Sequence, residues 1–241
     1  MGVRLLFLAR PDKRNAMTPA MLEQLLAEIE RFEVERGSEP GWALLIGGEG
    51  RSFCSGFDLK LCANQPGTAE TLLNLLSRCI VALRRLDAPT VIAATGNAIA
   101  GAAALCGGAD CAVGDREGLY GYPVLRLGLS PAVSAPFLMP KAGDGNARQR
   151  LLDVGLLKGE DAVAAGLLTH AVDWPEDVIP KSMKLVRAMA AKPRHAFAAT
   201  KQLLRELDGA SDPARVAAGL AVSLATARSP EMHDRLSEFR K

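Results

Sequence analysis

The sequence lacks any pairing or clustering of its cysteines. It has five cysteines, an odd number, with neither a CxxC pair nor a neighbouring group of histidines. This pattern is neither a disulfide framework nor a set of metal ligands at the usual spacing. We therefore expect a reduced, cytoplasmic protein without a metal site.

Long apolar runs and runs of like charge are also absent. The apolar stretch at the start of the chain is too short for the core of a signal peptide and ends in charged residues. The 29 basic residues nearly balance the 27 acidic ones, which gives a formal net charge of +2 spread along the chain. We therefore expect neither membrane insertion nor nucleic-acid binding.

What the sequence does contain is an alternation of helical and strand patterns. Thr18 is a suitable N-cap and Pro19 a suitable first helical residue, and the pattern then continues to Gly37. Short apolar runs at 42–46 and 90–94 read as buried strands. The apolar residues of the first helix recur at helical spacing: Leu22, Leu25, Leu26, Ile29 and Phe32.

Three further segments extend this pattern. A second helix is predicted at about 68–86, and the Gly- and Ala-rich stretch 96–108 predicts a tight turn that leads into a short helix. A third strand is predicted at 111–113. From about residue 177 onward the patterns are consecutive helices. We therefore predict an α/β core over residues 1–176 and a helical region over 177–241.

Six segments, taken in order, resemble the crotonase superfamily, the enoyl-CoA hydratase/isomerase family, across nearly the whole chain. The most informative are GEGRSFCSGFDLK at 48–60 and GNAIAGAAALCGGADCAVG at 96–114. The other four are RPDKRNAMTPAMLEQL, LGLSPAVSAPFLMP, LLKGEDAVAAGLLTHAVD and KPRHAFAATKQLL. The resemblance implies a crotonase-like spiral of ββα units. It also implies a C-terminal helical region that forms a homotrimer or a hexamer made of two trimers.

The resemblance also implies a ligand, an acyl-coenzyme A thioester, and a way to bind it. In the family two backbone N–H groups bind the thioester oxygen on which negative charge develops, and each such donor contributes about 3 kcal/mol. Carried over to this sequence, the donors are the amides of Phe57 and Gly101. No permanently bound cofactor is expected, because coenzyme A arrives as part of the ligand.

The nucleotide end of the ligand carries phosphates, which favour cationic partners. The segments that touch the nucleotide in relatives supply four cations here, Lys13, Arg14, Lys60 and Lys201. The same comparison assigns Ser55, Asp58 and Leu59 to the lining of the coenzyme A site, with Asp58 also open to a purely structural role.

Three positions at which the family carries carboxylates hold apolar residues. The two glutamates of the hydratases correspond to Ala104 and Val124, and the glutamate of many isomerases corresponds to Ala132. Proton transfer by such groups contributes about a hundredfold to ten-thousandfold to a rate, and a methyl or isopropyl group transfers no proton. Ordinary hydration is therefore expected to be weak or absent.

Three functions remain open from the sequence. The first is an enzyme with a non-standard acyl-CoA reaction, which takes its acid and base from elsewhere or needs chiefly the two amides, as a decarboxylation or thioester cleavage would. The second is a non-catalytic protein that binds acyl-CoA, and the third is a scaffold that binds no CoA ester. Tyr122 is the first candidate for a replacement protic group. Further candidates near the same segments are Tyr120, Ser130, Ser134, Asp115 and Glu117.

Overall fold

The computed structural model describes residues 2–35 and 42–240, and its strands form two parallel sheets. The larger sheet has the order β1-β2-β3-β5-β7, and the smaller one pairs β4 with β6. The predicted strands at 42–46, 90–94 and 111–113 are confirmed as β2, β3 and β5. The strands are β1 (Val3–Leu8), β2 (Ala43–Gly48), β3 (Thr90–Ala94), β4 (Ala98–Ile99), β5 (Cys111–Asp115), β6 (Tyr120–Gly121) and β7 (His170–Val172).

Helices make up most of the rest of the described chain. The first predicted helix is α1, described up to Glu35, and its predicted end at Gly37 lies outside the described residues. The α-helices are α1 (Pro19–Glu35), α2 (Leu59–Asn64), α3 (Thr68–Arg85), α4 (Gly101–Gly108), α5 (Ala135–Leu152), α6 (Gly159–Ala164), α7 (Val178–Ala190), α8 (Arg194–Asp208), α9 (Pro213–Ala227) and α10 (Pro230–Ser237). Short 3-10 helices are η1 (Pro11–Lys13), η2 (Pro123–Leu127), η3 (Pro131–Ser134) and η4 (Pro175–Asp177).

Two successive turns of the chain, β3–β4 and β5–β6, each contribute one strand to each sheet, as in the predicted ββα spiral. β3 and β5 enter the larger sheet, whereas β4 and β6, which follow them, pair with each other. Isolated bridges extend the smaller sheet from Cys54 through Ala98 and Tyr120 to Leu157. This column of short pairings runs past the carboxyl ends of the larger sheet's strands, so it brings the loops after β2 and β3 together.

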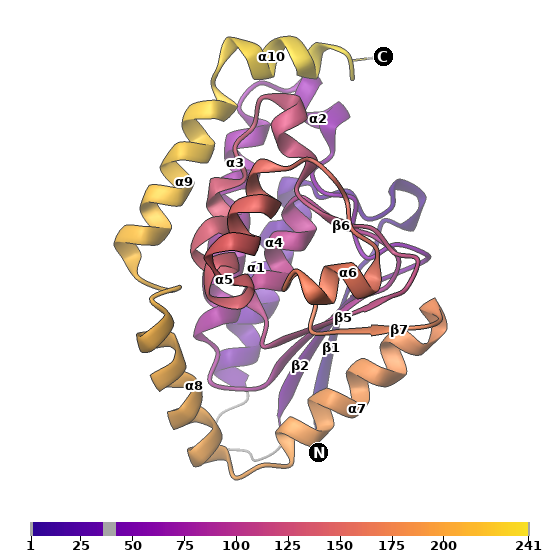
Figure 1. The fold of residues 1–241 in the computed structure, drawn as a ribbon, viewed down its shortest axis with the longest axis vertical. Helices are drawn as coiled ribbons and strands as arrows, with labels where there is room; N and C mark the ends of the chain where they lie inside the picture. Colours follow the sequence, from indigo (N-terminus) through magenta and orange to yellow (C-terminus); the bar gives the residue numbers. More distant parts are fainter. Residues whose placement is uncertain (1, 36–41, 241) are drawn as a thin grey trace.

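The larger sheet is covered on both faces, as expected for parallel strands. Alternate residues point to opposite faces. Ala43 and Leu45 of β2 pack toward α7, whereas Leu44 and Ile46 join the main core with α1 and α3. Figure 1 shows α7 on one side of the sheet and α1, α3 and α4 on the other.

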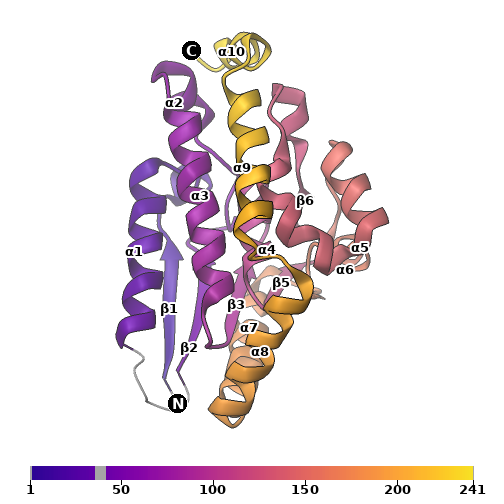
Figure 2. The same cartoon turned by 90° about the vertical axis from the view of Figure 1, so that its left-hand side faces the viewer.

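The helices after residue 177 therefore do two different things. α7 contributes Val178, Val186 and Ala190 to the core on its face of the sheet. In contrast, α8 and α9 run along the outer side of the helical layer, and α10 lies across its end next to α2 (Figure 1 and Figure 2). None of the helices in the described ranges is both long enough and apolar enough to cross a bilayer.

Asn15 ties the loop after β1 to the loop after β2. Its side chain is fully buried, its Oδ1 accepts from the Arg10 amide at 2.7 Å, and its Nδ2 donates to the carbonyls of Glu49 (2.9 Å) and Ser52 (2.8 Å). Its backbone is left-handed, with φ of 52°, a conformation that asparagine tolerates better than most residues. Asn15 therefore fixes the start of the segment that leads to Phe57.

Replacing Asn15 with alanine is expected to lower the free energy of unfolding by about 3 kcal/mol, because three backbone groups lose the partner that this buried side chain provides and alanine disfavours positive φ. Urea denaturation measures the change. The matched control is Asp12→Ala in the same loop, which removes an exposed side chain and should change stability by less than about 0.5 kcal/mol. Equal effects of the two substitutions would contradict this role for Asn15.

Candidate active site

An apolar cavity of about 240 Å³ lies where the two loops meet, between α3, α4, η2 and α10. Phe57 and Gly101 both line it, together with Leu73 and Leu76 of α3 and Met232 of α10. None of the described residues that line it carries a charged side chain. Its protic side chains are Ser55, Cys62, Tyr122, Ser130 and Ser134.

The amide of Phe57 is left without a protein acceptor by the way its neighbours pair. The Met17 amide donates to the Gly56 carbonyl at 2.8 Å, and the Met17 carbonyl accepts from the Asp58 amide at 3.0 Å. This parallel bridge between Met17 and Phe57 uses the groups on either side of Phe57 and leaves the N–H of Phe57 itself unused. Gly56 has φ of 97°, which favours glycine at the turn. Among the described residues no group accepts a hydrogen bond from the Phe57 amide.

The amide of Gly101 is free for a different reason. Gly101 is the first residue of α4, and the first N–H groups of a helix have no partner within it. No acceptor elsewhere in the described ranges takes this N–H. A Cβ at Gly101 would lie 3.2 Å from Cε1 of Phe57 and 3.3 Å from Cδ2 of Leu76. A side chain here would therefore fill the space beside Phe57.

Ala100 turns the chain into α4 with a strained backbone. Its φ of 57° and ψ of −114° lie where non-glycine residues are rarely found. The turn is held by the Ala100 amide, which donates to the Gly121 carbonyl at 2.8 Å and so joins the end of β4 to the end of β6. This strained residue sets the direction of the next amide, that of Gly101.

Two unpartnered amides on one apolar cavity form a suitable place for a carbonyl oxygen that becomes more negative. The N-terminus of α4 adds the positive end of the helix dipole. Donors fixed in this way stabilise developing charge without reorganising, which is the physical basis of an oxyanion hole.

The three apolar positions noted in the sequence occupy different places. Val124 lines the cavity. Ala104 is buried in α4 but is not among the lining residues. Ala132 lies against α9, where a Cβ added to Gly219 would be 2.5 Å from its carbonyl oxygen. Only Val124 therefore presents its side chain to the cavity directly.

Of the protic candidates, Tyr122, Ser130 and Ser134 line the cavity. Tyr122 is 2% exposed and hydrogen-bonds Ser134, and burial raises the pKa of its phenol. At neutral pH this phenol is therefore protonated and is not a base. Burial likewise raises the pKa of Cys62 to about 12, which keeps that thiol protonated.

The other candidates have structural partners away from the cavity. Asp115 accepts from the amides of Gly96 and Gly118, and the Tyr120 hydroxyl accepts from the Asp115 amide at 2.9 Å. Glu117 forms an exposed ion pair with Lys158. These groups hold turns rather than line the site.

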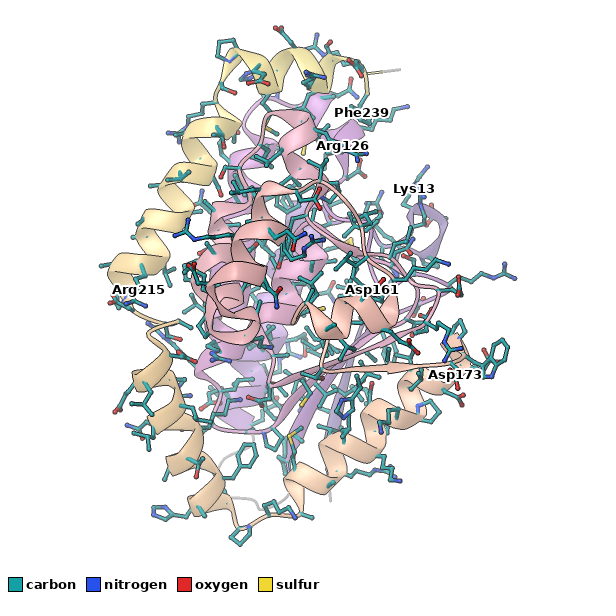
Figure 3. All side chains as sticks on the ribbon, viewed as in Figure 1. Lys13, Arg126, Asp161, Asp173, Arg215 and Phe239 are labelled. Atoms are coloured by element: carbon teal, nitrogen blue, oxygen red, sulfur yellow. The ribbon has the colours of Figure 1, made fainter. Side chains whose placement is uncertain are left out.

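The predicted coenzyme A contacts divide by position. Ser55 and Leu59 line the cavity, and Lys60 beside them is exposed. Lys13 and Arg14 are exposed on the loop after β1, where Lys13 lies on the outside of the molecule (Figure 3). The Arg14 carbonyl accepts from the Ser55 amide at 3.0 Å, so this loop adjoins the cavity edge.

Asp58 has the structural role that the sequence left open. Its Oδ1 accepts from the Leu61 amide at 3.0 Å and caps α2, and its Oδ2 pairs with the Arg10 guanidinium at 3.0 Å. Both oxygens are therefore engaged within the protein. The pairing with Arg10 joins the loop after β1 to the start of α2.

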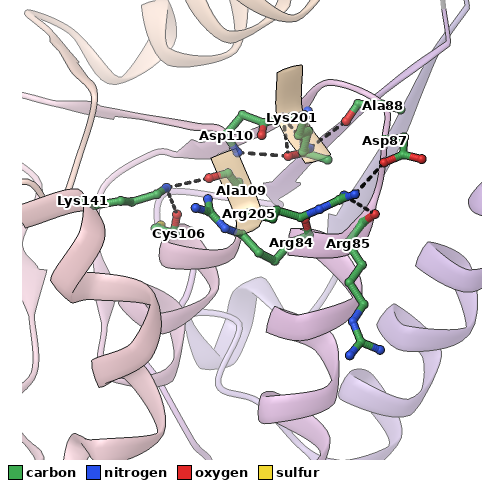
Figure 4. A network of polar contacts seen from close by, with 11 residues as sticks. Arg84, Arg85, Asp87, Ala88, Cys106, Ala109, Asp110, Lys141, Lys201 and Arg205 are labelled. Atoms are coloured by element: carbon green, nitrogen blue, oxygen red, sulfur yellow. Dashed lines mark hydrogen bonds and ion pairs between the residues drawn. The ribbon is translucent and has the colours of Figure 1, made fainter. Parts of the chain in front are cut away.

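Lys201 does not fit its predicted contact with the nucleotide. Its side chain is 7% exposed, and its ammonium donates to Asp110 at 2.8 Å and to the Ala88 carbonyl at 2.9 Å (Figure 4). It is not among the residues that line the cavity. Because a buried, paired ammonium is not available to a phosphate, we assign Lys201 to the packing of α8 on the core.

Two features of the site had no signal in the sequence. Met232 of α10 is 1% exposed and reaches the cavity from the far end of the chain. The strain at Ala100 depends on a turn whose torsions no residue pattern specifies. Both follow only from the three-dimensional placement of the elements.

Comparison with solved structures defines the class of fold. Over 99% of this chain and 89% of the other, the structure superimposes with a TM-score of 0.86 on an enoyl-CoA hydratase/isomerase from Xanthobacter autotrophicus Py2, at 23% sequence identity. The protein therefore has the crotonase fold, as predicted.

Comparison of sequences then shows the family. The enoyl-CoA hydratase/isomerase model matches residues 1–237, and the chain belongs to this family. It is 32% identical over 205 residues to a probable enoyl-CoA hydratase of Mycobacterium tuberculosis, which covers 84% of this chain and 78% of that protein. It is also 29% identical to the 1,2-epoxyphenylacetyl-CoA isomerase of Escherichia coli, over 86% of this chain and 80% of that enzyme.

Replacing Ala100 with glycine is expected to raise the free energy of unfolding by about 1 kcal/mol, since the relief of backbone strain exceeds the entropic cost of glycine. The control is Ala102→Gly, two residues further on inside α4, where the same change should lower stability by about 1 kcal/mol. Thermal and urea denaturation of both variants measure the difference. If Ala100→Gly destabilises as much as Ala102→Gly, the turn is not strained.

Proposed function

We propose that this protein binds acyl-CoA thioesters with the carbonyl oxygen between the amides of Phe57 and Gly101, and that it promotes a non-standard acyl-CoA reaction. Ordinary hydration is weak or absent. The observation that carries the proposal is the apolar cavity, which both residues line and which presents no charged side chain among the described residues. Membership of the enoyl-CoA hydratase/isomerase family supports the ligand class.

The composition of the cavity supports both parts of the proposal. Its apolar walls suit an acyl chain, since ligand pockets bury apolar groups against apolar side chains. A hydration, however, needs groups that activate water. The residue predicted to correspond to the second glutamate of the hydratases is Val124, which lines the cavity and exchanges no proton. Chemistry that depends mainly on polarising the thioester carbonyl remains available.

Binding of acyl-CoA is the first test. Calorimetric titration with a panel of saturated and unsaturated acyl-CoAs should give saturable binding. The thioester carbonyl stretch, isotope-edited with ¹³C, should move to lower frequency because two donors polarise the bond. Absence of binding across the panel would contradict the proposal, and only the assignments of family and fold would remain.

Gly101→Ala is expected to weaken acyl-CoA binding about tenfold and to reduce the carbonyl shift, because its methyl group occupies the space beside Phe57. Gly47→Ala is the matched control: its Cβ would also meet an aromatic ring, 2.8 Å from Cε1 of Phe7, but it lies in β2 and does not line the cavity. It should perturb packing to a similar degree but leave binding unchanged. Equal losses of affinity would contradict the assignment of Gly101.

The alternative function is a non-catalytic protein that binds acyl-CoA, and Tyr122 distinguishes the two. For the enzyme, Tyr122→Phe should lower turnover at least about a hundredfold with little change in affinity, because it removes a protic group and keeps the ring. Assays of hydration, isomerisation, decarboxylation and thioester cleavage measure this. Tight binding without turnover in all four assays would favour the alternative.

A homotrimer or a hexamer of two trimers is part of the proposal. Family resemblance supplies the expectation, and exposed apolar side chains on α8 and α9 are consistent with it. Those that are at least half exposed are Leu203, Leu204, Leu207 and Val222. Such side chains on neighbouring helices are suited to an interface between subunits.

A further inference from the structure

The far end of α4 is bound by a lysine from another helix. The ammonium of Lys141, on α5, donates to the carbonyl of Cys106 at 3.0 Å and to that of Ala109 at 2.5 Å (Figure 4). These are carbonyls at the C-terminus of α4, where a helix leaves its last C=O groups without partners. Lys141 therefore supplies donors that α4 cannot supply itself.

The hydrogen bonds of Lys141 go to the helix and not to a carboxylate. No carboxylate in the described ranges forms an ion pair with it; Arg84 repels its charge, and Asp110 attracts it without a direct contact. Desolvation lowers the pKa of Lys141 to about 8, which still leaves it cationic at pH 7. The direct contacts of this ammonium are thus with the negative end of α4.

The other end of the same helix is the proposed oxyanion hole. α4 has only eight residues, so its ends lie about 10 Å apart, and it is made of small, buried residues with few side-chain anchors. Close packing of α5 against α4 also keeps α4 in place, because a Cβ at Gly107 would lie 3.3 Å from Cβ of Phe137. A shift at the C-terminus of α4 would move the Gly101 amide with it.

We propose that Lys141 is a positioning residue for the oxyanion hole, acting through α4 on the amide of Gly101. Its two hydrogen bonds fix the helix along its axis, and its charge strengthens the dipole that the carbonyl oxygen meets at the other end. This inference rests on the proposed binding of an acyl-CoA carbonyl at Phe57 and Gly101.

Lys201 of α8 provides a matched comparison, because its partner Asp110 lies two residues beyond the end of α4. It too is a lysine that donates to a backbone carbonyl, but its other partner is the side chain of Asp110, which also accepts from the Thr90 amide at 2.8 Å. Lys201 thus holds the starts of β3 and β5 together, not the carbonyls of α4. Its loss should lower stability without altering the Gly101 amide.

The test is the ¹³C thioester carbonyl stretch of a bound saturated acyl-CoA at pH 7, measured for the wild-type protein and four variants. Lys141→Met removes the donors and the charge, Lys141→Gln keeps a neutral donor, and Lys141→Arg keeps both donors and charge. Lys201→Met controls for general loss of stability. Thermal denaturation of each variant is recorded alongside.

We expect Lys141→Met to lose more than half of the wild-type carbonyl shift, Lys141→Gln to lose part of it, and Lys141→Arg to restore it. Lys201→Met should retain the full shift although it melts at a lower temperature. If Lys141→Met does not fold, a smaller carbonyl shift in Lys141→Gln than in Lys141→Arg tests the same prediction. The role of Lys141 would be overturned if the loss of carbonyl shift followed the melting temperature in all variants. It would also be overturned if Lys141→Gln lost none of the carbonyl shift. No carbonyl shift in the wild-type protein would instead overturn the proposed function.

Discussion

The structure depends on a constraint that folded proteins usually satisfy: buried backbone N–H groups need acceptors. Here the amides of Phe57 and Gly101 have none among the described residues, and both residues line one apolar cavity. An acceptor oxygen that enters this cavity can pair with both amides, and a charged or polarised oxygen pairs more strongly than a neutral one.

The rest of the fold can be understood as the means of keeping those two amides in place. A column of short strand pairings brings the loops after β2 and β3 side by side. Met17 fixes the backbone on both sides of Phe57, and the strained Ala100 orients the start of α4. Since each of these contacts is made by backbone atoms, the arrangement tolerates many changes of side chain.

The sequence predicted the elements whose signal is local. Periodic apolar residues located α1 and α3, and the apolar run at 90–94 located β3, because burial requires apolar residues at regular or consecutive positions within one short segment. It did not predict β4 and β6, which are two residues long and form only because the spiral brings them together. Pairing between distant segments has no local pattern.

The site residues divide in the same way, into those with a local sequence pattern and those that depend on tertiary packing. The motifs pointed to Phe57 and Gly101, and the structure places both residues on one cavity. Lys201 was assigned to the nucleotide because a cation in a motif looks the same whether its partner is a phosphate or, as here, the carboxylate of Asp110. The contributions of Met232 and Lys141 depend on how α10 and α5 pack, which is decided by tertiary structure.

The most direct measurement is a crystal structure of the protein with a non-reactive acyl-CoA analogue. The account predicts that the analogue's carbonyl oxygen lies about 3 Å from both amide nitrogens, of Phe57 and of Gly101, with the acyl chain in the apolar cavity. A carbonyl oxygen that contacts neither amide, in an analogue bound elsewhere on the protein, would contradict it.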